Sequence, residues 1–405
     1  MGPHKTPGER PAARISSGEA AHRLGVKRET LYAYVSRGLL TSQRGPGNAG
    51  SSFSLAEVEA LQRSGTRARS SAARPFRFPA VTTKITSVAE DHLRYRGHDA
   101  VQLASTATFE AVVGLLWTGE LQDRRLLSSP QVTEQVATFM RGLSPATDLA
   151  SRLRVAISVA AALDPLRFDL APQAVQRSAA VAVACMVDAI SERHAPANAR
   201  IARRLWSALT PRRPNAQLLR CLDAALILVA DRGLAASTVA ARAAASARAN
   251  PYAVITAGLA CLEGPLHGAA GSDAHELLLG IVRGTSVESS AAQYLRRGED
   301  VPGISPGPPD PRAECLLTLL SQVPAAEQAL TSVETIMQTL NPGPSNSPTV
   351  ELALGALAVA AGMPIGTSDA ILAVGRSAGW IAHALEEYVE EPMRWRAQEI
   401  YTGPA

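Results

Sequence analysis

The residues best suited to chemistry lie in the segment 259–270, which reads Leu-Ala-Cys-Leu-Glu-Gly-Pro-Leu-His-Gly-Ala-Ala. It places His267 after a Gly-Pro break and directly before a helix-like run at 272–281. The first turn of a helix leaves backbone N–H groups unpaired, so an imidazole there can face a bound anion that those groups help to hold. From spacing alone, the alternative is a histidine in a turn that caps a helix.

A second chemical signal is Arg376, which lies in an otherwise apolar helical run. It shares a helical face with Trp380 and His383. A charge in such a run needs an anionic partner, because an unpaired buried charge is costly. That partner is either a ligand carboxylate or a side chain of the protein such as Glu386 or Glu387.

These features belong to an ordered set of motifs. Ahead of His267 stands Val-Ala-Asp-Arg-Gly-Leu-Ala-Ala-Ser-Thr (229–238), and the others are Tyr-Arg-Gly (95–97), Asp-Pro-Arg (310–312), Gly-Arg-Ser-Ala-Gly-Trp-Ile-Ala-His (375–383) and Tyr-Thr-Gly-Pro (401–404). Together they make residues 80–405 resemble the citrate synthase family, in which Gly-Pro-Leu-His-Gly-Gly-Ala follows His-Ala-Asp-His. The resemblance implies an all-α fold with a large domain (81–267 and 353–405) and a small domain (268–352) that closes over the substrate. It also implies a two-fold homodimer whose active sites draw on both subunits.

The resemblance also implies a reaction, the condensation of an acyl-CoA such as acetyl-CoA with a 2-oxo acid such as oxaloacetate. His267 matches the histidine that stabilises the enol of the thioester, and Glu351 stands where the family has the aspartate that removes the α-proton. Arg312, Arg376 and Arg394 match arginines that bind the carboxylates of the oxo acid, Arg394 from the neighbouring subunit. This chemistry needs a positioned base, charge stabilisation at the enolate and bidentate cations. It implies no metal and no cofactor besides the acyl-CoA co-substrate.

The chain departs from the family at several catalytic positions. The family's ketone-polarising histidine precedes Asp-Pro-Arg, but residues 303–310 here form a shorter, proline-rich loop without histidine, which also puts CoA binding in question. Glu351 moves the carboxylate by one methylene, and a displacement near 1 Å can cost on the order of a hundredfold in rate. Val229 and Arg232 replace the two histidines of His-Ala-Asp-His, and Ala235 replaces an asparagine. Arg232 can attract a carboxylate but cannot exchange a proton near neutral pH.

Three interpretations follow from this pattern. The first is a condensing enzyme of weakened or altered activity, in which Arg232 joins the arginines that hold the oxo acid. The second is a non-catalytic regulator, in which a di- or tricarboxylate or an acyl-CoA changes how a dimer presents its N-terminal domains to DNA. The third is a degenerate subunit that pairs with a catalytic synthase in a hetero-oligomer.

The charge is unevenly distributed along the chain. Residues 1–80 contain thirteen Lys or Arg and five Asp or Glu, a net charge of +8, so residues 81–405 carry about −4 of the total of +4. This asymmetry predicts an anionic partner for the N-terminal part alone.

The N-terminal part predicts a DNA-binding domain at 15–62, after a tail at 1–14 that we expect to be disordered. The segment 17–26 predicts a capped helix that ends at Gly25, with Ala20, Ala21 and Leu24 on one face, and a second helix follows at 27–37. With the sequel to residue 61, this resembles the winged helix-turn-helix of the MerR and excisionase families. Four residues of the second helix are the candidate DNA contacts: Lys27, Arg28, Thr30 and Arg37.

The alternative for the N-terminal domain is a small docking module whose charges only face water. Residues 63–80 follow it and are rich in arginine. We expect them to form a flexible basic linker, which either adds phosphate contacts or acts only as a tether.

Composition favours a large helical core. The chain has 405 residues, of which 46% are hydrophobic and 4% aromatic, so helices pack through small side chains. The β-branched residues at 82–89 predict a short strand pair, and apolar spacing then predicts helices at 109–117, 128–142, 149–163, 173–193, 216–230 and 238–246. The four cysteines lie in apolar runs without metal-ligand spacing: Cys185, Cys221, Cys261 and Cys315. We therefore expect reduced thiols in a cytoplasmic protein, and the lack of a long uncharged apolar run argues against membrane insertion.

Overall fold

The computed structural model describes residues 14–24, 26, 31, 34–35, 40–44, 51–55, 57–58, 81–89, 92–193, 195–264, 267–268, 270–340, 346–395 and 401–403. The chain divides into two compact units, one of residues 1–80 with 397–405 and one of residues 81–396. The four candidate DNA contacts Lys27, Arg28, Thr30 and Arg37 lie outside the described residues, as do the predicted tail up to residue 13 and the basic linker.

The N-terminal unit contains a helix and a small antiparallel sheet. Helix α1 (Ser17–Leu24) buries Ala20, Ala21 and Leu24, the face predicted from the sequence. The side chain of Ser16 begins the helix by accepting a hydrogen bond from the Glu19 backbone at 3.2 Å. The sheet has the order β1-β3-β2, with β1 (Arg14–Ser16), β2 (Ser42–Arg44) and β3 (Ser51–Ser54). Its buried residue Phe53 packs with α1 and Leu31 in a core of its own.

The larger unit is mostly helical, as the composition predicts. Its first part contains a small sheet of β4 (Thr86–Ala89), β5 (His92–Tyr95) and β6 (His98–Asp99), followed by α4 (Ala100–Thr106), α5 (Phe109–Thr118), α6 (Pro130–Arg141), α7 (Leu149–Leu163), α8 (Pro172–Asp188), α9 (Ile201–Leu209), α10 (Ala216–Leu228), α11 (Ala236–Ser246) and α12 (Pro251–Leu262). The predicted strand at 82–89 is present, but its partner, β5, lies beyond that segment.

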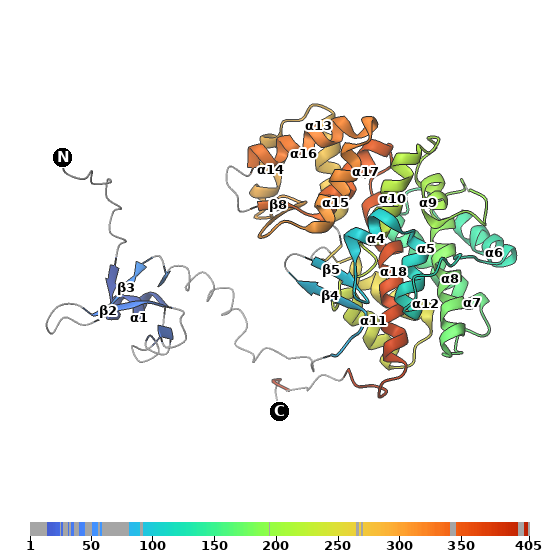
Figure 1. Ribbon diagram of the computed structural model, residues 1–405, viewed down its shortest axis with the longest axis horizontal. Helices are drawn as coiled ribbons and strands as arrows, with labels where there is room; N and C mark the ends of the chain where they lie inside the picture. Colours follow the sequence, from blue (N-terminus) through green and yellow to red (C-terminus); the bar gives the residue numbers. More distant parts are fainter. Residues whose placement is uncertain are drawn as a thin grey trace. The chain divides into compact units, whose positions relative to one another are not determined.

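The second part of this unit contains α13 (Ala270–Val282), α14 (Val287–Arg296), β7 (Ile304–Pro306), α15 (Pro311–Ser321), the short 3₁₀ helix η1 (Pro324–Ala326), α16 (Glu327–Leu340), β8 (Asn346–Pro348), α17 (Val350–Ala361) and α18 (Thr367–Glu387). Figure 1 shows α13 to α17 gathered together on one side, whereas α18 runs back through the group formed by α4 to α12. The predicted boundary at residue 353 falls within α17, which packs against α13, α15 and α16.

One predicted helix is too long. The apolar pattern suggested a helix up to Arg193, but α8 ends at Asp188. The reason lies in α9, because the Arg193 guanidinium donates to the carbonyl groups of Ser207 at 3.4 Å and Ala208 at 3.0 Å. Arg193 thus satisfies carbonyl groups at the end of another helix, which requires the chain to turn first.

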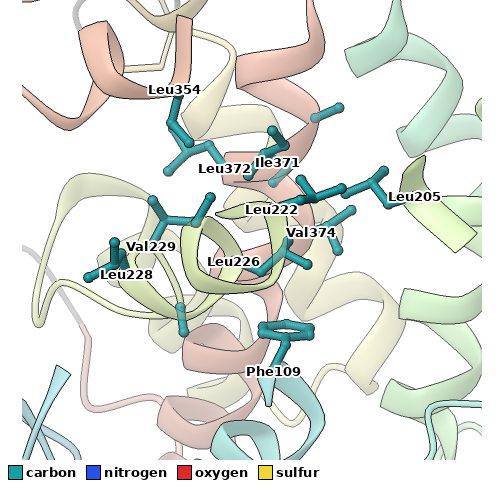
Figure 2. Close-up of a cluster of buried hydrophobic side chains, with 14 of the residues drawn as sticks. Phe109, Leu205, Leu222, Leu226, Leu228, Val229, Leu354, Ile371, Leu372 and Val374 are labelled. Atoms are coloured by element: carbon teal, nitrogen blue, oxygen red, sulfur yellow. The ribbon is translucent and has the colours of Figure 1, made fainter. Parts of the chain in front are cut away.

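The helix α18 forms the centre of the larger unit. It packs against α8, α10, α11 and α12, and almost all of its side chains are buried. Figure 2 shows Ile371 and Val374 of α18 close to Leu222 and Leu226 of α10. The end of α10 and the middle of α18 are therefore fixed against each other, and both carry residues of the site described below.

Two further observations concern the cysteine thiols and the length and apolar character of the helices. Cys185, Cys221, Cys261 and Cys315 are free thiols, and all but the partly buried Cys261 are buried. Within the described residues, no helix combines the length and the apolar character needed to cross a bilayer.

Candidate active site

A cavity of about 820 Å³ lies between the two groups of helices in the larger unit. Its walls come from the β4-β5 hairpin, the segment after α10, the loop before α15, the start of α17 and the middle of α18. It is lined by five of the six predicted site residues: Arg232, His267, Arg312, Glu351 and Arg376. In the described structure, Arg394 is not part of this lining.

His267 meets the beginning of α11. Its Nε2 atom lies 2.8 Å from the Ser237 hydroxyl and accepts the Ser237 backbone N–H at 3.3 Å. Because Nε2 accepts, the proton of the neutral ring is on Nδ1. Burial and the positive charge of Arg376 lower the pKa of His267, and the opposing effect of Glu351 is smaller. His267 is therefore a neutral imidazole at pH 7 with an Nδ1–H group free of this contact.

Arg376 is a buried cation with spare hydrogen-bonding capacity. Its side chain is 3% exposed, and its Nε–H donates to the Val229 carbonyl at 3.1 Å. One terminal nitrogen, Nη1, is buried and has no hydrogen-bond partner within the described part of the chain. Burial lowers the pKa of Arg376, opposed by the carboxylate of Asp231. The guanidinium thus adds a positive charge to the cavity wall, and its hydrogen-bonding capacity is not filled within the described residues.

The side chains considered as partners for Arg376 are bound elsewhere. Glu386 accepts from Arg242 Nη1 at 2.9 Å, and Glu387 accepts from Arg242 Nε at 3.0 Å. Glu387 also binds Arg394 through two hydrogen bonds of 2.6 and 2.8 Å. Glu386 and Glu387 are therefore not the partners of Arg376, and the protein carboxylate whose charge acts on Arg376 is Asp231. Within one chain, Arg394 is itself paired.

Arg312 and Arg232 differ in how far a carboxylate of the protein already balances their positive charges. Arg312 is 5% exposed and binds Asp310 through hydrogen bonds of 3.0 and 2.7 Å. Arg232 is exposed, and the nearby charge of Arg312 is the main reason why its pKa is lowered. The lining therefore holds three guanidinium groups and the two carboxylates of Asp310 and Glu351. This balance leaves a net positive wall.

Glu351 and the loop before α15 form the opposite wall. Glu351 lies in the first turn of α17, and the backbone N–H of Thr349 holds the start of that helix to the Gly303 carbonyl at 2.9 Å. Ser305 lines the cavity from this loop, and its hydroxyl makes only a 3.4 Å contact with the Pro306 carbonyl. The site thus has a carboxylate base candidate in Glu351, and Ser305 adds a hydroxyl from this loop.

Sequence reasoning missed three residues at the site. Asp310 precedes a proline at a helix start, a pattern that predicts a capping residue, but its pairing with Arg312 needs the fold. Ser237 stands at the second position of α11, inside a motif already identified. His92 lines the cavity from β5, opposite Ala89 in the hairpin, and no motif points to it.

A buried polar network lies behind the cavity. The His383 Nδ1 atom is 2.8 Å from Arg242 Nη1, and its Nε2 atom is 3.3 Å from Asp231. Arginine only donates, so Nδ1 accepts and Nε2–H faces the Asp231 carboxylate. The negative charge of Asp231 also opposes the effect of burial, which lowers the pKa of Arg376. The network therefore links the cavity wall to the end of α18.

The sequence of this chain is similar to those of known proteins. A family profile described as "Citrate synthase, C-terminal domain" matches residues 76–398. Citrate synthase 2 of Bacillus subtilis is 28% identical over 353 residues, covering 80% of this chain and 94% of the relative. A 2-methylcitrate synthase of Mycobacterium tuberculosis is 26% identical over 337 residues, covering 76% of this chain and 84% of the relative.

Solved structures show the same fold. Citrate synthase from Thermoplasma acidophilum, in a ternary complex with carboxymethyl coenzyme A and oxaloacetate, has a TM-score of 0.67 at 22% identity and covers 81% of this chain and 94% of that one. Citrate synthase from Pyrobaculum aerophilum has a TM-score of 0.67 at 24% identity, covering 80% and 91%. With the profile covering most of the chain, the protein belongs to the citrate synthase family.

Proposed function

We propose that the cavity binds a 2-oxo dicarboxylate such as oxaloacetate and condenses it slowly with an acyl-CoA such as acetyl-CoA. The observation that carries this proposal is Arg376, a buried guanidinium in the cavity wall with an unfilled donor. A buried cation with spare donors favours a carboxylate, which accepts bidentate hydrogen bonds. Arg232 and Arg312 line the same cavity and supply further positive charge.

In the proposed reaction, Glu351 removes a proton from the methyl group next to the thioester carbonyl. His267 donates its Nδ1–H to the thioester oxygen, where negative charge develops. The enolate carbon then attacks the ketone carbon of the oxo acid, a C–C bond forms, and the ketone oxygen takes up a proton. Water then hydrolyses the thioester and releases the thiol. A neutral imidazole can fill this role, because its Nδ1–H group is a hydrogen-bond donor.

The rate is expected to be low. Ser305 offers a neutral hydroxyl where the family has a histidine to polarise the ketone, and Glu351 is longer than an aspartate. The loss of one preorganised donor typically costs about 10² to 10³ in rate. Binding of the oxo acid depends on the arginines instead and is expected to persist.

The test measures turnover and binding separately. Purified protein receives acetyl-CoA and oxaloacetate while thiol release is followed, and oxaloacetate binding is measured by calorimetry. We expect saturable binding and slow thiol release that disappears in His267→Ala. Equal thiol release in wild type and His267→Ala would refute the catalytic proposal.

The second candidate function is a carboxylate- or acyl-CoA-sensing regulator that binds DNA. It is favoured by the N-terminal unit, whose helix and sheet have their own core and whose sequence is strongly basic. Lys27, Arg28, Thr30 and Arg37 are the proposed DNA contacts. Fluorescence anisotropy with labelled duplex DNA tests this function. A change in DNA affinity on adding oxaloacetate, with no thiol release, would favour the regulator over the enzyme.

We further propose a homodimer. A groove of about 600 Å³ on α6 and α7 is lined mainly by apolar residues, among them Phe139, which is 61% exposed. Large exposed apolar side chains of this kind are typical of interfaces. In a dimer, Arg394 is proposed to exchange Glu387 for a ligand bound by the partner. Light scattering after size-exclusion chromatography tests this, and a monomer, or assembly only with a second synthase-like chain, would contradict it.

A further inference from the structure

The segment that carries His267 is fastened to α18 by one carboxylate. Helix α13 begins at Ala270, three positions after His267. Its Ser272 donates its backbone N–H to Asp369 Oδ1 at 3.1 Å and its hydroxyl to Asp369 Oδ2. Asp369 lies in the first turn of α18. The two contacts therefore join the first helix of one group in Figure 1 to the central helix of the other.

The backbone is shaped to allow this contact. A Cβ atom at Gly271 would lie 2.8 Å from Asp369 Oδ1 and 3.0 Å from Ser368 Cβ. The first distance would force the Asp369 carboxylate to move, and the second would require a small shift of Ser368. Glycine at position 271 thus lets the start of α13 come within hydrogen-bonding distance of the carboxylate.

The contact lies directly behind the candidate active site. Asp369 and Gly268 line a second cavity of about 180 Å³. Leu262 and Leu372 line both this cavity and the larger one. A change in the contact between Asp369 and Ser272 therefore acts on the segment that sets the position of His267.

We infer that Asp369 is a positioning residue that latches α13 onto α18 through Ser272, and so holds His267 at the beginning of α11. The latch concerns the unliganded protein and stands independently of the reaction proposed above. The part played by His267 in catalysis rests on that proposed function.

The stability of the latch depends on the protonation of the Asp369 carboxyl. Burial raises the pKa of Asp369 to about 6, although hydrogen bonds from Ser272 lower it. Other charged groups near Asp369 are Asp273 on α13, which raises that pKa, and Asp148 and Glu263 in the wall of the small cavity, Glu263 being bound by Arg154 at 3.0 Å. When the junction opens, the carboxyl enters water and its pKa returns towards 3.8. The closed state therefore binds more protons than the open state, and lowering the pH favours closure.

Amide hydrogen exchange of the full-length, unliganded protein tests the latch. The readout is the exchange rate of peptides covering 267–282 in wild type, Asp369→Asn and Asp369→Ala, compared at equal pH. Asparagine keeps an acceptor and a donor for Ser272 but does not titrate. Glu276→Gln on the same helix removes an equal charge from an exposed site and serves as the control.

Two results are expected. Asp369→Ala exchanges about tenfold faster than Asp369→Asn over 267–282, because both hydrogen bonds are lost. The ratio of wild-type to Asp369→Asn exchange rises about tenfold from pH 5 to pH 7.5, whereas the ratio of Glu276→Gln to wild type stays near one. The latch would be refuted if the Asp369→Ala and Asp369→Asn variants exchanged at equal rates over 267–282. It would also be refuted if the ratio of the wild-type exchange rate to that of Asp369→Asn did not change with pH. If the Ala variant fails to fold, the pH dependence decides. Failure of oxaloacetate to bind wild type would refute the proposed function but not this result.

Discussion

The three arginines of the cavity are not equivalent. Arg312 has a carboxylate partner in Asp310, whereas Arg232 is exposed and its charge is partly screened by water. Arg376 is buried and is bound by one carbonyl, and its Nη1 atom has no hydrogen-bond partner among the residues that the structure describes. Because Arg376 is buried, an anionic ligand should stabilise its charge more than the charges of Arg232 and Arg312. We therefore expect Arg376 to dominate the affinity for a carboxylate.

This inequality predicts the effect of replacing Arg376. Arg376→Gln should weaken oxaloacetate binding by about a hundredfold or more, since truncating one partner of a buried, hydrogen-bonded charge pair costs several kcal/mol. Titration calorimetry measures the change, and circular dichroism checks the fold. Arg213→Gln removes an equal charge from an exposed position and should leave the affinity unchanged. A less than threefold loss in Arg376→Gln would refute the assignment.

The protonation of His267 gives a second test at a single residue. Its pKa is lowered from 6.5 by burial and by Arg376, so the ring should remain neutral when an exposed histidine is half protonated. The ¹³Cε1–¹H resonance that is missing from His267→Asn identifies the ring in an NMR titration. We expect its midpoint below pH 6.5, and a midpoint above that value would contradict the described environment.

At the level of elements, the site depends on the close packing of α18 against the end of α10. Gly375 allows this, because a Cβ atom there would lie 2.6 Å from Val229 Cγ2 and 2.9 Å from the Leu226 carbonyl. Gly379 donates its N–H to the Ala230 carbonyl at 3.0 Å. These contacts hold Val229, whose carbonyl binds Arg376.

Gly375→Ala should therefore destabilise the protein by about 1–3 kcal/mol, the usual cost of overpacking a core. It should also weaken oxaloacetate binding, because the Val229 carbonyl is displaced. Gly280→Ala, in helix α13 with no atom closer than 3.8 Å, is the matched control and should be neutral or slightly stabilising. Urea unfolding measures the free energy of unfolding of both variants. Equal stability of the two variants would show that α18 and α10 are less tightly packed than described.

At the level of the whole molecule, the chain combines a basic N-terminal unit with a larger unit of the citrate synthase family. The two units have separate cores. In the functions proposed above, the basic charge of the N-terminal unit favours nucleic acid as its partner, whereas the arginines of the cavity wall favour small anions.

Replacing Lys27 and Arg28 with alanine should therefore weaken DNA binding and leave oxaloacetate affinity unchanged. Each lost phosphate contact should reduce the slope of log affinity against log salt by about 0.9. Anisotropy titrations over a range of salt measure the slope, and Arg213→Ala, outside the N-terminal unit, is the control. A slope that does not change would refute the assignment of these residues to DNA.

Much of the fold was predictable from local patterns. Apolar spacing gave α7 its observed bounds, and the buried face of α1 was identified from Ala20, Ala21 and Leu24. The end of α8 was not predictable, because it depends on a contact with α9. Helix α12 was also missed, since residues such as Val254 and Ile255 are buried around much of its surface and leave no clear periodicity.

The sequence by itself determined the helical family fold and the identity of the candidate site residues, because motif order and residue type are properties of the chain. Only the tertiary structure decided how their charges are matched. Arg312 is bound by Asp310 and Arg394 by Glu387, whereas one terminal nitrogen of Arg376 has no hydrogen-bond partner in the described part of the chain. Pairing depends on distance and burial, which bring together groups that lie far apart in the sequence, and no single motif contains that information.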